Sequence, residues 1–213
     1  MKRTCIIFAL LILVSLTAFS QDPEFQYYKN NEIKTLLGRS KPGGAYISFT
    51  TGYSRIDNYH TILTGGRISW IANHSIGLGF GGTGFINEFH YEPSLDREVF
   101  LSGGYGGFYI EPILLPLSPV HFSFPVLFGA GGISFLSKDR GFNENFFDDF
   151  RAFLLIEPSA EIELNLTRYF RLAFGASCRL PASFDFGQTG PYTIDVESLR
   201  TFSYLVTFKF GKF

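Results

Sequence analysis

The sequence predicts an all-β protein, an eight-stranded antiparallel up-and-down transmembrane β-barrel with short periplasmic turns and longer extracellular loops. Three features predict this fold: an apolar leader at the N-terminus, a series of alternating strands, and a last strand with one apolar face. The composition agrees, because 46% of the residues are hydrophobic and 18% aromatic but only 17% are charged. An average soluble domain has roughly 25% charged residues.

The N-terminus resembles a secretory signal peptide. Lys2 and Arg3 precede an apolar run that begins at Cys5, and the run ends in Ala18-Phe19-Ser20. This order of basic, apolar and small residues predicts cleavage after Ser20, which leaves Gln21 first. The alternative is a membrane anchor, but the run is short for a spanning helix. Cleavage removes two basic residues and makes the formal charge of −1 more negative by two units. A small negative charge does not indicate a nucleic-acid partner.

The chain divides into three parts. Residues 1–20 form the signal peptide, residues 21–42 a polar periplasmic lead-in, and residues 43–213 the outer-membrane barrel. The lead-in either tucks under the barrel or forms a disordered tail, and both alternatives stay open. After the leader, no apolar run is long enough for a transmembrane helix, so any membrane crossing must use strands.

Eight segments read as candidate strands because apolar and polar residues alternate along them. Each segment exceeds the roughly 9–11 residues that a tilted strand needs to cross a bilayer. The predicted strands are 43–54, 59–72, 75–88, 98–114, 120–136, 151–165, 169–181 and 199–211.

The connections between these strands alternate in length. Three are tight, at residues 73–74, 115–119 and 166–168, whereas three are long and polar, at 89–97, 138–150 and 181–198. The connection at 55–58 is short but belongs to the second set by its position in the series. Outer-membrane barrels have short periplasmic turns and longer outer loops. The alternation therefore places both chain ends in the periplasm.

The last strand, from Thr201 to Phe213, carries the predicted assembly signal. Its alternating apolar residues fall on one face and an aromatic residue ends the chain, a pattern similar to the signal that barrel-assembly machinery reads. Phe213 lies out of phase with the alternating series, and Leu205 is a large apolar residue on the otherwise polar face. The predicted signal residues are Phe202, Tyr204, Val206, Phe208, Phe210 and Phe213.

The polar face of each strand should line the lumen, and the apolar face should meet lipid. In the strand at 169–181 this rule places Arg171 and Arg179 inside and Cys178 outside, with Glu161 or Glu163 of the preceding strand as the expected partner of Arg171. An eight-stranded barrel has an interior that side chains just fill, and buried charges must be paired. The predicted lumen charge network consists of Arg67, Glu111, Glu157, Glu161, Glu163, Arg171 and Arg179.

Two glycine-rich segments and the chain end resemble a known family. They are residues 103–112, residues 119–132 and the terminal Phe208-Lys209-Phe210-Gly211-Lys212-Phe213. These segments look like those of the small, porin-like outer-membrane barrels of Bacteroidetes-type Gram-negative bacteria. The resemblance covers residues 43–213 and implies the fold and the outer-membrane location. It implies no catalytic residues.

Two alternatives to a structural or binding barrel stay open. His121 and Ser123 share one strand face, where a histidine could activate a serine, and the spacing resembles that of outer-membrane lipid A deacylases. However, the pair faces the lumen at the periplasmic end, and no acidic residue is evidently placed to orient the histidine. The second alternative is a narrow pore for small solutes.

The sequence therefore predicts a non-enzymatic barrel of the cell envelope that needs no cofactor and no metal. The expected partners are outer-membrane lipid, the barrel-assembly machinery and an envelope protein whose identity stays open, with no nucleic acid. A lumen filled by oppositely charged side chains favours a closed barrel over a channel.

Overall fold

The computed structural model describes residues 43–92, 97–137, 150–183 and 195–213. The predicted signal peptide and lead-in lie outside these residues and stay predictions. Among the described residues, no helix is long and apolar enough to cross a membrane.

The described chain is almost entirely β-structure, in close agreement with the predicted strands. The strands are β1 (Gly44–Ile56), β2 (Tyr59–Ala72), β3 (Ile76–Asn87), β4 (His90–Glu92), β5 (Arg97–Leu114), β6 (Val120–Ser123), β7 (Val126–Ser137), β8 (Phe150–Asn165), β9 (Phe170–Cys178), β10 (Leu180–Ser183) and β11 (Phe202–Lys212). One short 3₁₀ helix, η1 (Val196–Leu199), precedes β11.

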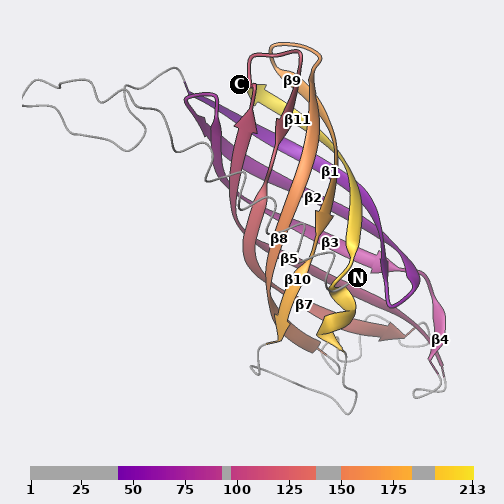
Figure 1. Ribbon diagram of the computed structural model, residues 1–213. Coiled ribbons are helices and arrows are strands. Elements are labelled where there is room, and N and C mark those ends of the chain that lie inside the picture. Colours follow the sequence, from indigo (N-terminus) through magenta and orange to yellow (C-terminus); the bar gives the residue numbers. More distant parts are fainter. Residues whose placement is uncertain (1–42, 93–96, 138–149, 184–194) are drawn as a thin grey trace, which may run out of the picture.

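The strands close into a single antiparallel barrel (Figure 1). Each main strand pairs with its neighbour in the chain, and β1 also pairs with β11, from Ala45 opposite Lys212 to Ser54 opposite Ser203. The ring has eight members, because β6 and β7 together form one span, β9 and β10 form another, and β4 only extends β5. The predicted eight-stranded up-and-down barrel is confirmed.

Proline explains the break between β6 and β7. Phe124 and Pro125 separate the two strands, and proline has no amide hydrogen to donate to a ladder. The pairing resumes around the break, since Ser159 donates its amide to the carbonyl of Pro125 at 2.8 Å. The other break, between β9 and β10, falls at Arg179.

The two ends of the barrel differ, as the lengths of the connections predict. We call "turn end" the end with the tight connections at residues 73–75, 115–119 and 166–169, and "loop end" the opposite one (Figure 1). Asn73 and His74 have φ of 52° and 60°, and Asp57 and Asn58 have φ of 53° and 67°. Asp57 and Asn58 form a two-residue hairpin connection in the left-handed region, the geometry that matches strand twist, whereas Asn73 and His74 belong to a three-residue connection.

The two faces of the wall follow the predicted alternation. Large apolar side chains point outward and are exposed, for example Ile68 at 64%, Phe80 at 70% and Tyr204 at 66%. Charged and hydroxyl side chains point inward and are buried. A soluble protein would bury its apolar face, so an apolar exterior around a polar interior is the distribution of a membrane-spanning barrel.

Cys178 has the predicted outward parity, beside Phe202 of β11. Its side chain is nevertheless 0% exposed. The expectation that it faces lipid or a neighbouring barrel stays a prediction, because parity sets the direction of a side chain and not what covers it.

Apolar side chains close the lumen toward both ends. At the turn end, Tyr46, Ile71 and Ile113 pack with Phe213, and we call this group the floor cluster. Toward the loop end lies a larger group, the plug cluster, in which Val196 and Leu199 of η1 join nine inward residues of the strands. These nine are Ile56, Leu63, Phe85, Leu101, Tyr105, Leu127, Ile133, Phe153 and Leu155.

Candidate functional site

The candidate site is a buried ion network in the turn-end half of the lumen. Its arginine, lysine and glutamate side chains come from β2, β5, β8, β9 and β11, and β1 and β6 add Tyr46, His121 and Ser123; each occupies an inward position of its strand. Glycines leave room for them: a Cβ on Gly175 would lie 2.8 Å from Cγ of Glu161, and one on Gly77 would lie 3.1 Å from Glu111 Oε2. The glycine-rich strands thus accommodate long charged side chains from their neighbours.

Lys209 of β11 is the centre of this network. Its ammonium donates to Glu111 Oε1 at 2.5 Å, lies 3.0 Å from Glu161 Oε2, and also donates to Glu163 Oε1. All four side chains are at most 3% exposed. One cation from the closing strand therefore neutralises carboxylates on β5 and β8, across the barrel.

Arg67 of β2 binds the same carboxylates from another side. Its Nη2 donates to both oxygens of Glu161, at 3.0 and 2.8 Å, and lies 3.6 Å from Glu111 Oε1. Its guanidinium lies 5.5 Å from the ring centre of Tyr109 and 5.9 Å from that of Tyr46. Tyr46 also donates its hydroxyl to Glu111. The two tyrosine rings supply cation–π contacts that a desolvated guanidinium favours.

Arg171 of β9 completes the turn-end side of the network. Its Nη1 lies 3.6 Å from Glu163 Oε2, so the partner is Glu163, one of the two expected from the sequence. The Arg171 guanidinium also lies 3.9 Å from the ring centre of Phe213, which stacks on Tyr46. The last residue of the chain therefore covers the ion network on its turn-end side, and its out-of-phase position directs it inward.

His121 and Ser123 lie in the same network. Nε2 of His121 is 2.9 Å from Glu163 Oε2, and Ser123 donates its hydroxyl to Glu161 Oε2 at 3.3 Å. The expectation that no acidic residue stands beside the histidine was wrong, because Glu163 of the neighbouring strand does. Both side chains are 0% exposed, however, and the serine hydroxyl is directed to a carboxylate. In the described residues, the pair therefore forms part of the buried hydrogen-bond network.

Two predicted members lie farther toward the loop end. Glu157 accepts a hydrogen bond from Ser177 at 2.7 Å, and Arg179 donates through Nη2 to the hydroxyls of Ser54 and Thr201 at 2.5 and 2.7 Å. Arg179 and Glu157 occupy opposite positions of the β8–β9 ladder, judged from the register on either side. Within the described part of the chain, neither forms an ion pair, so the structure separates them from the network.

Sequence reasoning missed Lys209 and Tyr46 as members of the network. The signal was present for both, since Lys209 lies on the polar face of the last strand and Tyr46 alternates with Ser48. Including Lys209 changes the charge balance. In the part of the chain that the structure describes, four buried cations, Arg67, Arg171, Arg179 and Lys209, match four buried carboxylates.

The spacing of three carboxylates would suit a metal ion. Oxygens of Glu111, Glu161 and Glu163 lie within 4.8 Å of one another. The Lys209 ammonium contacts all three, so the protein's own cation occupies the position that an ion would need. The arrangement resembles an internal salt bridge and not a metal centre.

Comparisons with solved structures find outer-membrane barrels. The N-terminal barrel domain of Pseudomonas aeruginosa OprF is 9% identical, with a TM-score of 0.48, over 79% of this chain and 96% of that one. Ail, the attachment invasion locus protein of Yersinia pestis, is 13% identical, with a TM-score of 0.38, over 79% and 94%. Ail in a phospholipid nanodisc is 14% identical, with a TM-score of 0.39, over 80% and 99%.

These TM-scores lie below 0.5, so the likeness carries no argument about activity or partners. No protein-family model matches the chain, and no curated protein sequence does. The fold assignment rests on the strand pairing and the facing of the side chains described above.

Proposed function

We propose that the protein is an outer-membrane barrel with a closed lumen that serves as a rigid scaffold, with its interaction surface at the loop end. The observation that carries this proposal is the filling of the lumen by the floor cluster, the ion network and the plug cluster. Buried charges that are paired across the barrel hold the strands together and leave no wide polar path.

The apolar exterior supports a location in a membrane, and the predicted signal peptide supports the outer membrane. Outer-membrane lipid is then the first partner of the barrel wall, and the barrel-assembly machinery is its expected insertion partner. The resemblance to Bacteroidetes-type barrels remains a prediction from the sequence.

A structural or binding role is favoured over a lipid-modifying enzyme. The one histidine–serine pair that could act on lipid, His121 and Ser123, is fully buried and engaged with carboxylates. Exposed side chains at the loop end, such as Tyr91 at 56% and Phe89 at 56%, lie where an envelope partner could bind.

The proposal can be tested by labelling in intact cells. In a Cys178→Ala background, Asn58→Cys places a thiol at the loop end and Thr167→Cys places one at the turn end. A membrane-impermeant maleimide should label Asn58→Cys in intact cells, whereas Thr167→Cys should require lysis. The reverse pattern, or recovery of the protein outside the outer-membrane fraction, would contradict the proposed location and orientation.

A further inference from the structure

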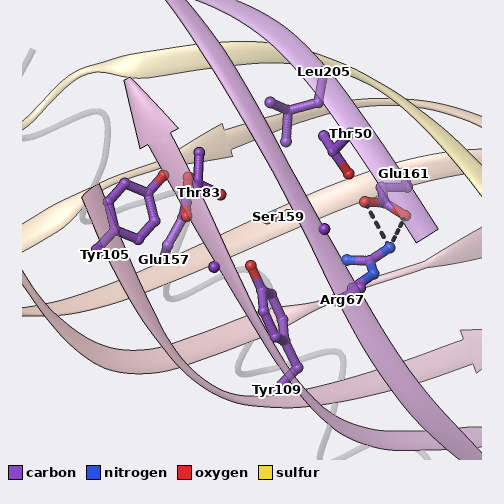
Figure 2. A pocket seen from close by; sticks show the side chains of 11 residues that line it. Thr50, Arg67, Thr83, Tyr105, Tyr109, Glu157, Ser159, Glu161 and Leu205 are labelled. Atoms are coloured by element: carbon purple, nitrogen blue, oxygen red, sulfur yellow. Dashed lines mark hydrogen bonds and ion pairs between the residues drawn. The ribbon is translucent and has the colours of Figure 1, made fainter. Parts of the chain in front are cut away.

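A small cavity lies in the lumen between the ion network and the plug cluster. Its volume is about 30 Å³, and Figure 2 shows the Arg67–Glu161 pair on one side and Tyr105 beside Glu157 on the other. Most of the residues that line it have polar side chains, among them Thr50, Thr83, Tyr109 and Ser159.

Two buried groups at this cavity are incompletely partnered. Nε of Arg67 is buried and has no hydrogen-bond partner among the described residues. The carboxylate of Glu157 accepts a hydrogen bond from Ser177 and is on a residue only 5% exposed, but in the described chain no cation lies within ion-pair distance of it. Buried polar groups without a partner are costly, and ordered water is the usual remedy.

We propose that the cavity binds ordered water that connects Glu157 to Arg67. A cavity needs roughly 10–15 Å³ to hold one water molecule, so the volume suits about two. The lining also offers the several polar partners that a buried water requires. The waters join the carboxylate of the loop-end half to the ion network of the turn-end half, so the polar interior becomes one continuous hydrogen-bonded structure.

The balance of buried charges in the lumen favours water over a metal cation in the cavity. Among the described residues, four buried lysine and arginine side chains already equal four buried carboxylates. Of the charged residues in the lining, Glu161 is already paired with Arg67, and the Arg67 guanidinium would repel a cation placed beside its Nε. A cation there would leave the low-dielectric lumen with an unbalanced positive charge, which is strongly unfavourable.

A crystal structure that resolves ordered water tests the proposal directly. We expect one or two water peaks within hydrogen-bond distance of Arg67 Nε, with at least one also bound to Glu157. Crystals grown with rubidium should show no anomalous peak in the cavity. A cavity without density, or one with an anomalous cation peak, would overturn the proposal.

A pair of serine variants tests it in solution. Ser159 lines the cavity, whereas the Ser203 hydroxyl is buried without a partner among the described residues and Ser203 lies outside the lining. Ser159→Ala removes a partner of the water and should raise the unfolding equilibrium constant about fivefold, whereas Ser203→Ala should leave it unchanged or lower it. Equal effects of the two substitutions would contradict a bound water at Ser159.

Discussion

At the scale of single residues, the protein depends most on Lys209. This side chain is 1% exposed and is shared by three carboxylates from two strands across the lumen. Its flexible stem and compact ammonium suit a position in which three acceptors converge from different directions. Without it, three glutamates would be buried with too few cations.

Lys209→Met should destabilise the barrel strongly. Removing one partner of a buried ion pair leaves the other charge uncompensated and costs about 3–5 kcal/mol. The change is measured by urea unfolding of the vesicle-embedded protein, followed by the gel shift between folded and unfolded forms. Lys212→Met, on the exposed side of the same strand, is the control and should change the unfolding midpoint little. Equal midpoints for both variants would show that Lys209 does not hold the network.

At the scale of elements, β11 has two separate tasks. Its outward residues meet lipid, with Phe210 at 50% exposed, while Lys209 and Phe213 enter the lumen from the alternate positions. Pairing of β11 with β1 closes the ring and delivers both residues at once. The pairing that closes the barrel therefore also brings the Lys209 ammonium to the buried carboxylates.

Phe208→Asp should block assembly, because it places a charge on the lipid face of the closing strand. The cost reaches up to about 4 kcal/mol for a charge at mid-bilayer and is smaller near the interface or for an acid. The measurement is the amount of heat-modifiable protein in the outer-membrane fraction. Phe208→Leu is the control and should assemble normally. Wild-type amounts of the Asp variant would contradict the lipid-facing assignment of Phe208.

The short helix η1 packs into the loop end of the lumen. Asp195 caps it by accepting the Glu197 amide at 2.9 Å, and Val196 and Leu199 project into the plug cluster at 3% and 1% exposure. In Figure 1, η1 lies at the loop end of the barrel, directly before β11. A segment between strands thus contributes to the core of the molecule.

Leu199→Ala should lower the free energy of unfolding by about 2–5 kcal/mol, the range for emptying a buried leucine site. Leu117→Ala is a matched control at the turn end, where the side chain is 85% exposed, and it should have little effect. Both are measured by the same urea unfolding. If the two substitutions are equally mild, η1 does not seal the lumen in solution.

At the scale of the whole molecule, the lumen has a layered order. From the turn end it runs through the floor cluster, the ion network, the cavity of about 30 Å³ and the plug cluster. Apolar layers on both sides keep bulk water away from the charges, and this raises the strength of each ion pair. These layers fill the lumen along the described strands, which supports the proposed closed barrel.

Purified protein in a planar bilayer should therefore show no steady large conductance. The cavity volume suits about two water molecules, and the paired charges around it are fixed by contacts from several strands. The Leu199→Ala variant provides a comparison, since loosening the plug alone should still leave the ion network closed. Steady large conductance of the unmodified protein would contradict the closed lumen.

Much of the fold follows from local sequence patterns. The period of two in each strand determined which side chains face inward, so seven lumen charges were predicted from parity and all seven are buried. Strand limits agree within a few residues, because turn residues such as Asn73-His74 and the polar connections mark them locally. The break in the β6–β7 span at Pro125 was not predicted, because a proline does not by itself mark a break: Pro112 and Pro158 lie inside the continuous strands β5 and β8.

Partner choice across the lumen was decided by the tertiary structure alone. Parity places Lys209 inside, but only closure of β11 onto β1 brings it to Glu111, Glu161 and Glu163, which are 46 to 98 positions away in the chain. Likewise Arg179 donates its hydrogen bonds to Ser54 and Thr201, whereas Glu157 lines the cavity. The sequence by itself determined the direction of each side chain, since this depends on its own strand. The contacts that it makes depend on barrel diameter and stagger, which exist only once all eight strands have closed.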